Sequence, residues 1–511
     1  MKEALNYIKK EKNYIITIFI ITFIWGIITH GFMFANSALS HDSLMESIIN
    51  DGLIDWKISL GRILYPTYIY LTRGILVVPW LIGIISLIYI AISSILILKI
   101  FDIDKDNHIM KIITPGILVA NVTMISLCGV FIEDMDVDMF AMMSSVIAVF
   151  LWRKHKKGYL YGTIPLFISL GLYQSYLSMA ISLIMIVSII DLLKKEEFKT
   201  VFNNGLRAIL MIILAGLIYI IILKLIPIIF KKSVTSGTYN SLDTIFKMSL
   251  IEIIRETILC YLYTIKTIIY PASLYPDIIT ILINIVLIVG AGYIILSKVF
   301  SKNIKVKEKI LILLLIFLLP FSMNISRILT NGMSHDLMHY SLWLTNLFII
   351  LIYIFDNKKH NKLKMISITL ITIILLGNVR MANTLYMMKE IAEEKTQSYM
   401  NRVIYSIESF EDYIPNKTKV VIEGSPNMNI EFNNATDNLR RITGAGEDFS
   451  LYVGEYGRYD YYLKMFQYAN INIIENPYLD KIEQWEINNM PVYPNKGSIK
   501  YIDDILVVKL G

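Results

Sequence analysis

Long apolar stretches separated by short polar gaps run through most of the 511-residue chain. Most are about 17–25 residues long, the length that an α-helix needs to cross a bilayer. With 55% hydrophobic residues and a mean hydropathy of +0.57, they predict a polytopic α-helical membrane protein. We expect about eleven transmembrane helices, near residues 14–34, 74–100, 112–131, 139–152, 160–174, 176–193, 206–230, 277–298, 309–326, 341–355 and 363–380.

Charged residues in the gaps orient these helices. Lysines precede the first stretch, and basic residues return in alternate gaps, a distribution that places loops in the cytoplasm. We therefore expect a multi-pass plasma-membrane protein with a cytoplasmic N-terminus. After an odd number of spans, the C-terminal part lies outside. The basic gaps are Lys105–Lys111, Arg153–Lys157, Lys194–Lys199, Lys302–Lys309 and Lys358–Lys364.

One apolar stretch fits two structures. Residues 159–193 are interrupted only by Gly171, Gln174 and Ser175, which suits either two short helices in a hairpin or one long tilted helix. A single helix would invert the topology of everything that follows. The later basic gaps favour the hairpin.

Three segments on the predicted outer side are longer than tight turns. The first, 35–73, has a short amphipathic stretch around Trp56, and the second, 231–276, has an amphipathic helix at about 242–270. Helices of this kind lie on a membrane surface. The third, 331–340, holds two histidines and an aspartate.

The composition changes from about Ala382, where a polar helical stretch (387–410) leads into β-branched runs. We expect a small α/β domain of about 125 residues with its own core. The predicted domains are thus 1–381, a transmembrane domain with outer amphipathic helices, and 382–511, an extracytoplasmic domain. The strand-like runs are 418–423, 471–474, 498–502 and 505–510, with a further helix near 459–468.

Several kinds of site are missing from the sequence. There is no Walker loop, dinucleotide fingerprint, Ser/His/Asp arrangement or Cys/His metal cluster, so we expect any donor to arrive through the membrane. The net charge of +6 comes from the alternate basic loops and does not indicate nucleic acid. Cys128 and Cys260 give no disulfide framework.

Carboxylates gather in the first outer segment and in a short gap after residue 131. Burying acids at a membrane boundary is costly, so such a group usually marks a site. A carboxylate beside other acids can act as general base on a hydroxyl. Any single acid is also explained as a helix cap or topology signal, whereas the set indicates function. The acids are Asp42, Glu46, Asp51 and Asp55, then Glu133, Asp134, Asp136 and Asp138.

Two arginines on the predicted outer side, Arg62 and Arg327, are candidate ligands for a lipid phosphate. The guanidinium group presents a fixed fork of donors that matches phosphate oxygens. Snorkelling to lipid headgroups is the alternative for both.

Two further polar groups are candidates for substrate contact. Tyr173 and Gln174 place polar atoms in the membrane plane, where they face a protein cavity or simply accompany helix packing through Gly171. His335 and His339 have the spacing of metal ligands but lack a third firm ligand, so a solvated loop is the alternative.

Three stretches resemble the bacterial glucosyltransferase II family of O-antigen and surface-glycan modifying enzymes. Gly61–Leu64 is similar to the family's Gly-Arg-x-Leu, which follows an acidic first loop. Phe131–Met135 is similar to Phe-x-Glu-Asn-Met, and Ser169–Gln174 to Ser-x-Gly-x-Tyr-Gln. Their order and spacing also agree, and the many-span body with a small C-terminal domain fits, so the resemblance covers most of the chain.

This resemblance implies a GT-C-like membrane glycosyltransferase. It would take glucose from an undecaprenyl-phosphate carrier on the outer face and attach it to a glycan. It also implies an acidic first-loop base, which falls on Asp42. The chain departs from the family where His41 precedes Asp42 and where Asp134 replaces a common Asn, so the exact base and the sugar stay open.

The expected reaction is an inverting transfer of a hexose from a polyprenyl-phosphate donor to a cell-surface glycan. Asp42, with Glu133 or Asp134 nearby, takes the acceptor proton, and Arg62 and Arg327 balance the leaving phosphate. The chemistry requires no metal, although the acids could hold Mg²⁺ or Mn²⁺. The remaining substrate-binding candidates are Asp138, Tyr173, Gln174, His335 and His339.

Two other functions fit parts of the pattern. A lipid-linked glycan flippase needs charged groups along the midplane of its spans, whereas here the charges gather at one rim. A non-catalytic glycan-binding membrane protein would tolerate loss of the loop acids but depend on residues 382–511.

Overall fold

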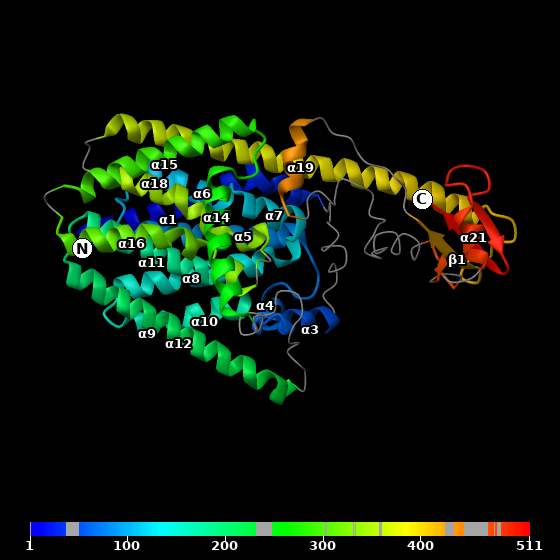
Figure 1. Cartoon of the computed structure of the whole chain (residues 1–511), viewed down its shortest axis with the longest axis horizontal. Coiled ribbons are helices and arrows are strands. Elements are labelled where there is room, and N and C mark those ends of the chain that lie inside the picture. The colour runs from blue at the N-terminus through cyan, green and yellow to red at the C-terminus, as the bar shows by residue number, and fades with distance from the viewer. Residues whose placement is uncertain are drawn as a thin grey trace. The chain divides into compact units, whose positions relative to one another are not determined.

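A computed structural model describes residues 2–36, 51–230, 248–301, 304–330, 332, 334–356, 360–424, 434–443, 469–474, 476–477 and 482–511 (Figure 1). Its contacts divide these residues into two compact units, which meet between Asn383 and Thr384. The first unit is built from helices, and the second holds a small sheet.

The first unit consists of long apolar helices joined by short helical pieces. The long helices are α1 (Lys2–Ala35), α5 (Pro79–Ile100), α8 (Met135–Lys154), α11 (Leu177–Leu193), α12 (Phe198–Phe230), α14 (Leu250–Ile269), α15 (Asp277–Val299), α16 (Val306–Met323) and the first part of α19 (Asn361–Glu408), which continues into the second unit. The shorter helices are α3 (Asp51–Ser59), α4 (Tyr65–Thr72), α6 (His108–Val119), α7 (Val122–Val130), α9 (Gly158–Tyr161), α10 (Thr163–Leu172), α17 (Ser326–Leu329) and α18 (Leu344–Ile354). Four single 3-10 turns are Ile132–Asp134, Gln174–Tyr176, Asp336–Met338 and Tyr340–Trp343.

Within the described ranges, seven helices are long and apolar enough to cross a membrane, and the bent pair α6 and α7 makes up to eight. The fold is therefore that of a helical membrane protein, with fewer clear spans than the predicted eleven. The segments at 160–174 and 341–355 are helical but shorter than a span. The helix at the predicted span 309–326 is α16, which begins earlier, at Val306, and carries three charged residues in its first turn. It is therefore not among the clear spans.

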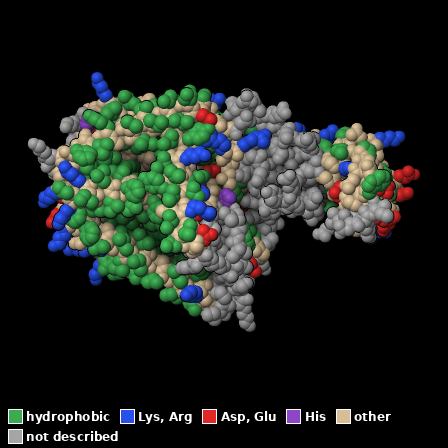
Figure 2. Space-filling view, in the orientation of Figure 1, with side chains coloured by type: hydrophobic (Ala, Val, Ile, Leu, Met, Phe, Trp, Pro, Cys, Tyr) green, Lys and Arg blue, Asp and Glu red, His purple; other side chains and the backbone are tan. Residues whose placement is uncertain are grey.

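Basic residues from the alternate gaps gather at one end of this unit, where ion pairs join the helix ends (Figure 2). Arg153 makes two hydrogen bonds to Asp191, of 2.6 and 2.8 Å. We call this the basic end. Its other pairs are Glu11 with Lys99 and Lys105, Asp102 with Lys154, and Asp356 with Lys298.

Residues 159–193 form the hairpin and not the single long helix. Asp191, near the end of α11, meets Arg153 at the end of α8. The hairpin turn lies at the middle of α8, because Ser145 bonds both the Ser169 hydroxyl (2.9 Å) and the Tyr176 carbonyl (2.8 Å). The chain thus runs from the basic end to mid-depth and back.

Helix α14 is the amphipathic helix predicted in the second outer segment, and Ser249 and Glu252 form a capping box at its start. Its burial is the reverse of that in a soluble protein. Glu256, Cys260 and Thr264 are buried along one stripe. The apolar residues Leu250, Ile251, Ile254, Ile258 and Leu262 are exposed. A helix with lipid on one side and polar protein on the other has this pattern.

The second unit contains a four-stranded sheet in the order β2-β1-β4-β3. β1 pairs in parallel with β2 and β4, and β3 is antiparallel to β4. Alternate residues point to opposite faces, where one core includes the end of α19 and the other includes α21. The elements are β1 (Lys419–Glu423), η5 (Asn434–Arg441), β2 (Asn472–Ile473), α21 (Ile482–Asn488), β3 (Ile499–Ile502) and β4 (Ile505–Lys509).

The sequence and the structure differ at the entry to this unit. The predicted span at 363–380 and polar helix at 387–410 are one continuous helix, α19. No residue with strong helix-breaking character separates the two halves, because the intervening segment contains neither Gly nor Pro. The predicted helix near 459–468 lies outside the described residues.

Candidate active site

The acids after residue 131 are brought together by the start of α8. Phe131 ends α7, a 3-10 turn follows, and α8 then begins at Met135. Glu133, Asp134, Asp136 and Asp138 are all buried in this stretch. Carboxylates near a helix N-terminus are favoured by the helix dipole, which offsets part of the cost of burying them.

Asp134 holds two cations from the first outer segment. Lys57 Nζ and Arg62 Nη1 each lie 2.6 Å from the same oxygen, Oδ2. Lys57 lies on α3, and the following turn brings the Arg62 backbone N–H to the Lys57 carbonyl at 3.0 Å. Burial alone would lower the pKa of Arg62, but the neighbouring groups, with the charge of Asp134 first among them, together outweigh burial and raise the pKa, so Arg62 stays a cation.

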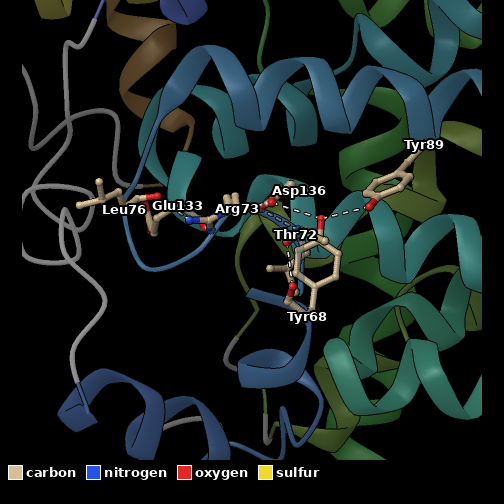
Figure 3. Close-up of polar contacts among 8 residues, drawn as sticks. Tyr68, Thr72, Arg73, Leu76, Tyr89, Glu133 and Asp136 are labelled. Carbon is tan, nitrogen blue, oxygen red and sulfur yellow. Dashed lines mark hydrogen bonds and ion pairs between the residues drawn. The ribbon is translucent and has the colours of Figure 1, made fainter. Parts of the chain in front are cut away.

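Asp136 forms a second, fully buried ion pair (Figure 3). Arg73 Nε lies 2.9 Å from Asp136 Oδ2, and the Tyr68 hydroxyl donates to the same oxygen at 3.2 Å. The other side of the Arg73 guanidinium donates to the Glu133 carbonyl. Arg73 therefore fixes the 3-10 turn that carries Glu133 and Asp134.

Some carboxylate oxygens in this group remain unsatisfied. Neither oxygen of Asp138 has a hydrogen-bond partner in the part of the chain that the structure describes, and the same holds for Oδ1 of Asp134. Asp138 follows Asp134 by one helical turn and is fully buried. Such oxygens can accept hydrogen bonds from hydroxyl groups of a ligand.

The hairpin turn completes this site. The guanidinium carbon of Arg62 lies 4.1 Å from the centroid of the Tyr173 ring. Gln174 donates to the Leu60 carbonyl (3.1 Å) and to the Tyr219 hydroxyl (2.8 Å), which in turn donates to the Gly61 carbonyl (2.9 Å). Gln174 therefore braces the turn before Arg62.

Two of the sequence motifs meet directly at this turn. The Leu64 N–H donates to the Gly171 carbonyl at 2.8 Å. A Cβ atom at residue 171 would lie 2.8 Å from the Leu64 side chain, so only glycine fits without a shift. We call Lys57, Arg62, Arg73, Asp134, Asp136 and Asp138 together the α8 cluster.

The comparison with protein families now identifies the chain. The family model of glucosyl transferase GtrII matches residues 31–335, which is more than half of the chain. The chain belongs to the GtrII glucosyltransferase family. The matched region contains the whole α8 cluster and the hairpin. Neither the curated proteins nor the solved structures gave a match.

Membership of the GtrII family makes this protein a membrane glycosyltransferase and decides against the flippase and binding-protein alternatives. Asp42, the first-loop acid that the family pattern singles out, lies outside the described residues, as does Glu46. Lys57, Arg73 and Tyr68 were not predicted from the sequence. For Lys57 and Arg73 the sequence did contain a signal, because both are basic residues in the outer segment that also holds Arg62.

Arg327 of this GtrII protein belongs to a different group of side chains. Its guanidinium lies 3.7 Å from Glu256 and 5.1 Å from the centroid of the Tyr263 ring. His339 packs on the same ring at 5.4 Å between centroids. With Asn324, these residues form what we call the α14 cluster. Arg62 and Arg327 therefore have separate partners.

The histidine pair of the third outer segment is split by burial. His339 is buried, 3.9 Å from Asp336, whereas His335 is partly exposed just before the 3-10 turn 336–338. No three His, Cys, Asp or Glu side chains within the described ranges are arranged to hold a metal ion.

Proposed function

We propose that this GtrII enzyme transfers glucose from a polyprenyl-phosphate carrier to a surface glycan, with inversion at the anomeric carbon. The observation that carries the proposal is the sharing of one Asp134 oxygen by Lys57 and Arg62. Family membership supplies the glucosyl transfer, and this arrangement supplies a cation for the phosphate.

Arg62 can bind the phosphate without leaving Asp134 alone. When its guanidinium turns to phosphate oxygens, Lys57 still neutralises the buried carboxylate. The ring of Tyr173 then supports the guanidinium from one face. Arg327, the second cation expected at the phosphate, lies in the separate α14 cluster, 3.7 Å from Glu256, so Arg62 carries this contact in the proposal.

The base in this proposal is Asp42, as the family pattern implies. It takes the proton of the acceptor hydroxyl while that oxygen bonds to the anomeric carbon and the bond to the phosphate oxygen breaks. The lipid monophosphate leaves with the electron pair, and Arg62 stabilises its charge. Oxygens of Asp134 and Asp138 accept hydrogen bonds from substrate hydroxyls, and Glu133 lies in the turn that Arg73 fixes.

We place the α8 cluster on the outer side of the membrane, because α8 runs from this cluster to the basic end, which the charge pattern assigns to the cytoplasm. A polyprenyl carrier reaches such a site from within the bilayer. In the same scheme the hairpin starts and ends on the cytoplasmic side, the number of full crossings is odd, and the second unit lies outside and helps to bind the acceptor glycan.

The test replaces Asp42→Asn and Glu133→Gln singly and measures glucose transfer from polyprenyl-phosphate glucose in membranes. We expect Asp42→Asn to lower the rate by about 10²-fold or more, because general-base catalysis is worth this much. Glu133→Gln should have a smaller effect. Asp102→Asn, in the partly exposed pair with Lys154 at the basic end, is the matched control. Full activity in both site variants would overturn the mechanism.

A further inference from the structure

We infer that the α14 cluster, Glu256, Tyr263, Asn324, Arg327 and His339, binds a sugar ring through its hydroxyl groups. The inference rests on the proposed glycosyl transfer and adds a second polar subsite to that of the α8 cluster. The sugar is either the hexose of the donor or the terminal residue of the acceptor, which share the same chemistry.

Hydrogen-bonding capacity is left unused in this cluster. Within the described ranges, five atoms of four side chains have no hydrogen-bond partner: Glu256 Oε2, Asn324 Nδ2, Arg327 Nε and both ring nitrogens of His339. Glu256, Asn324 and His339 are at most 3% exposed. Buried polar atoms are nearly always paired in proteins, so a concentration of unpaired ones indicates a place where water or a ligand completes the hydrogen bonds.

The polar stripe of helix α14 forms one side of this candidate ligand site. The stripe of α14 that includes Glu256 and Cys260 faces inward, and the Cys260 thiol donates to the Asn324 carbonyl at 3.1 Å. The apolar stripe is left on the surface. Burying a carboxylate in this way costs free energy, so a carboxylate kept in such a position usually marks a site.

The chemistry of the cluster fits hydroxyl groups better than a phosphate. Asn324 and Arg327 offer donors, Glu256 offers an acceptor, and a neutral imidazole offers one of each. A hydroxyl both donates and accepts, whereas a phosphate ester only accepts and is repelled by Glu256. The formal charges also balance, because Arg255 and Arg327 flank Glu256, and Asp336 lies beside His339.

A packed row of aromatic rings connects the two clusters. Tyr173, which faces Arg62, lies 5.9 Å from Tyr176 between centroids, and Tyr176 lies 5.9 Å from Tyr340. Tyr340 directly follows His339. These three packed rings therefore connect a sugar at the α14 cluster with the proposed phosphate site at Arg62. Two subsites of one reaction need such a connection.

Binding is tested on the purified full-length protein in a detergent without a sugar headgroup. Methyl glucoside should raise the thermal unfolding midpoint of the wild type, and Glu256→Gln and His339→Gln should reduce this shift at least threefold. Thr257→Val is the matched control on α14, because its hydroxyl bonds to the carbonyl of Ile253 in its own helix. An unchanged shift in both variants overturns the inference.

Inorganic phosphate is the second probe. We expect its stabilising shift to depend on Arg62 and to survive in Glu256→Gln. A phosphate shift that is instead lost in Arg327→Gln and kept in Arg62→Gln would make the α14 cluster an anion site and overturn the sugar assignment. These binding measurements need no turnover, so they stand even if Asp42→Asn leaves transfer intact.

Kinetics then assign the source of the sugar. In Glu256→Gln and His339→Gln, a KM raised about tenfold for the glycan acceptor alone assigns the subsite to the acceptor. The same rise for polyprenyl-phosphate glucose alone assigns it to the donor hexose. If both KM values stay at the wild-type level while kcat falls, the residues act only on structure and the inference is wrong.

Discussion

The α8 and α14 clusters are both buried groups of charged side chains, yet they differ in how their hydrogen bonds are used. In the α8 cluster, Asp134 and Asp136 hold three cations from the first outer segment. In the α14 cluster, the Arg327–Glu256 contact is long at 3.7 Å, and His339 has no hydrogen-bond partner among the described residues. The first cluster assembles the site, whereas the second keeps its capacity for a ligand.

Breaking the Arg73–Asp136 pair should produce the largest effect. Both side chains are fully buried, so Asp136→Asn leaves Arg73 with an uncompensated charge and should lower the free energy of unfolding by about 3–5 kcal/mol. The thermal unfolding midpoint of the purified protein measures this. Asp102→Asn, in a partly exposed pair at the basic end, is the control and should cost less than about 1 kcal/mol. Equal losses in the two variants would show that burial does not distinguish these pairs.

Arg62 should separate activity from stability. Arg62→Lys removes the bidentate fork but keeps a charge near Asp134, which Lys57 also neutralises. We expect glucose transfer to fall about 10²-fold, as for loss of one transition-state donor, with little change in the unfolding midpoint. Lys57→Met, which leaves Arg62 in place, serves for comparison and should retain more activity. Wild-type transfer by Arg62→Lys would rule out a fork contact with the phosphate.

The smallest change in stability should come from the α14 cluster. His339→Phe removes two nitrogens that make no hydrogen bond and keeps a ring against Tyr263. The unfolding midpoint without ligand should stay the same or correspond to a gain of about 1 kcal/mol, because no paired group is lost. Methyl glucoside should no longer raise it. A loss of stability as large as that of Asp136→Asn would mean that His339 is a structural residue.

Much of the fold and part of the candidate site could be predicted from the sequence. Apolar length and alternating basic gaps predicted the helical membrane body, and β-branched runs predicted the four strands. The number of spans did not follow, because tertiary packing ends helices such as α10 at mid-depth. The motifs that pointed to Arg62, Tyr173 and Gln174 also meet in the structure.

Other site residues could not be derived from the pattern. Which cation pairs with which acid depends on how α3 and the segment after α4 fold back onto α8, so Lys57 and Arg73 were missed. The burial of Glu256 could not be predicted either, because it depends on whether lipid or water covers the opposite, apolar stripe of the amphipathic helix. The contact between Arg327 and Glu256 could not be predicted from the sequence, so Arg327 was predicted to bind the phosphate.

The contact between Gly171 and Leu64 ties two stretches that are a hundred residues apart into one unit of variation. A side chain added at residue 171 requires the side chain at residue 64 to move or to become smaller. A larger residue at either position alone would push the first outer segment away from the hairpin and move Arg62 with it. A library that diversifies this enzyme should therefore change both positions together, in opposite directions of size.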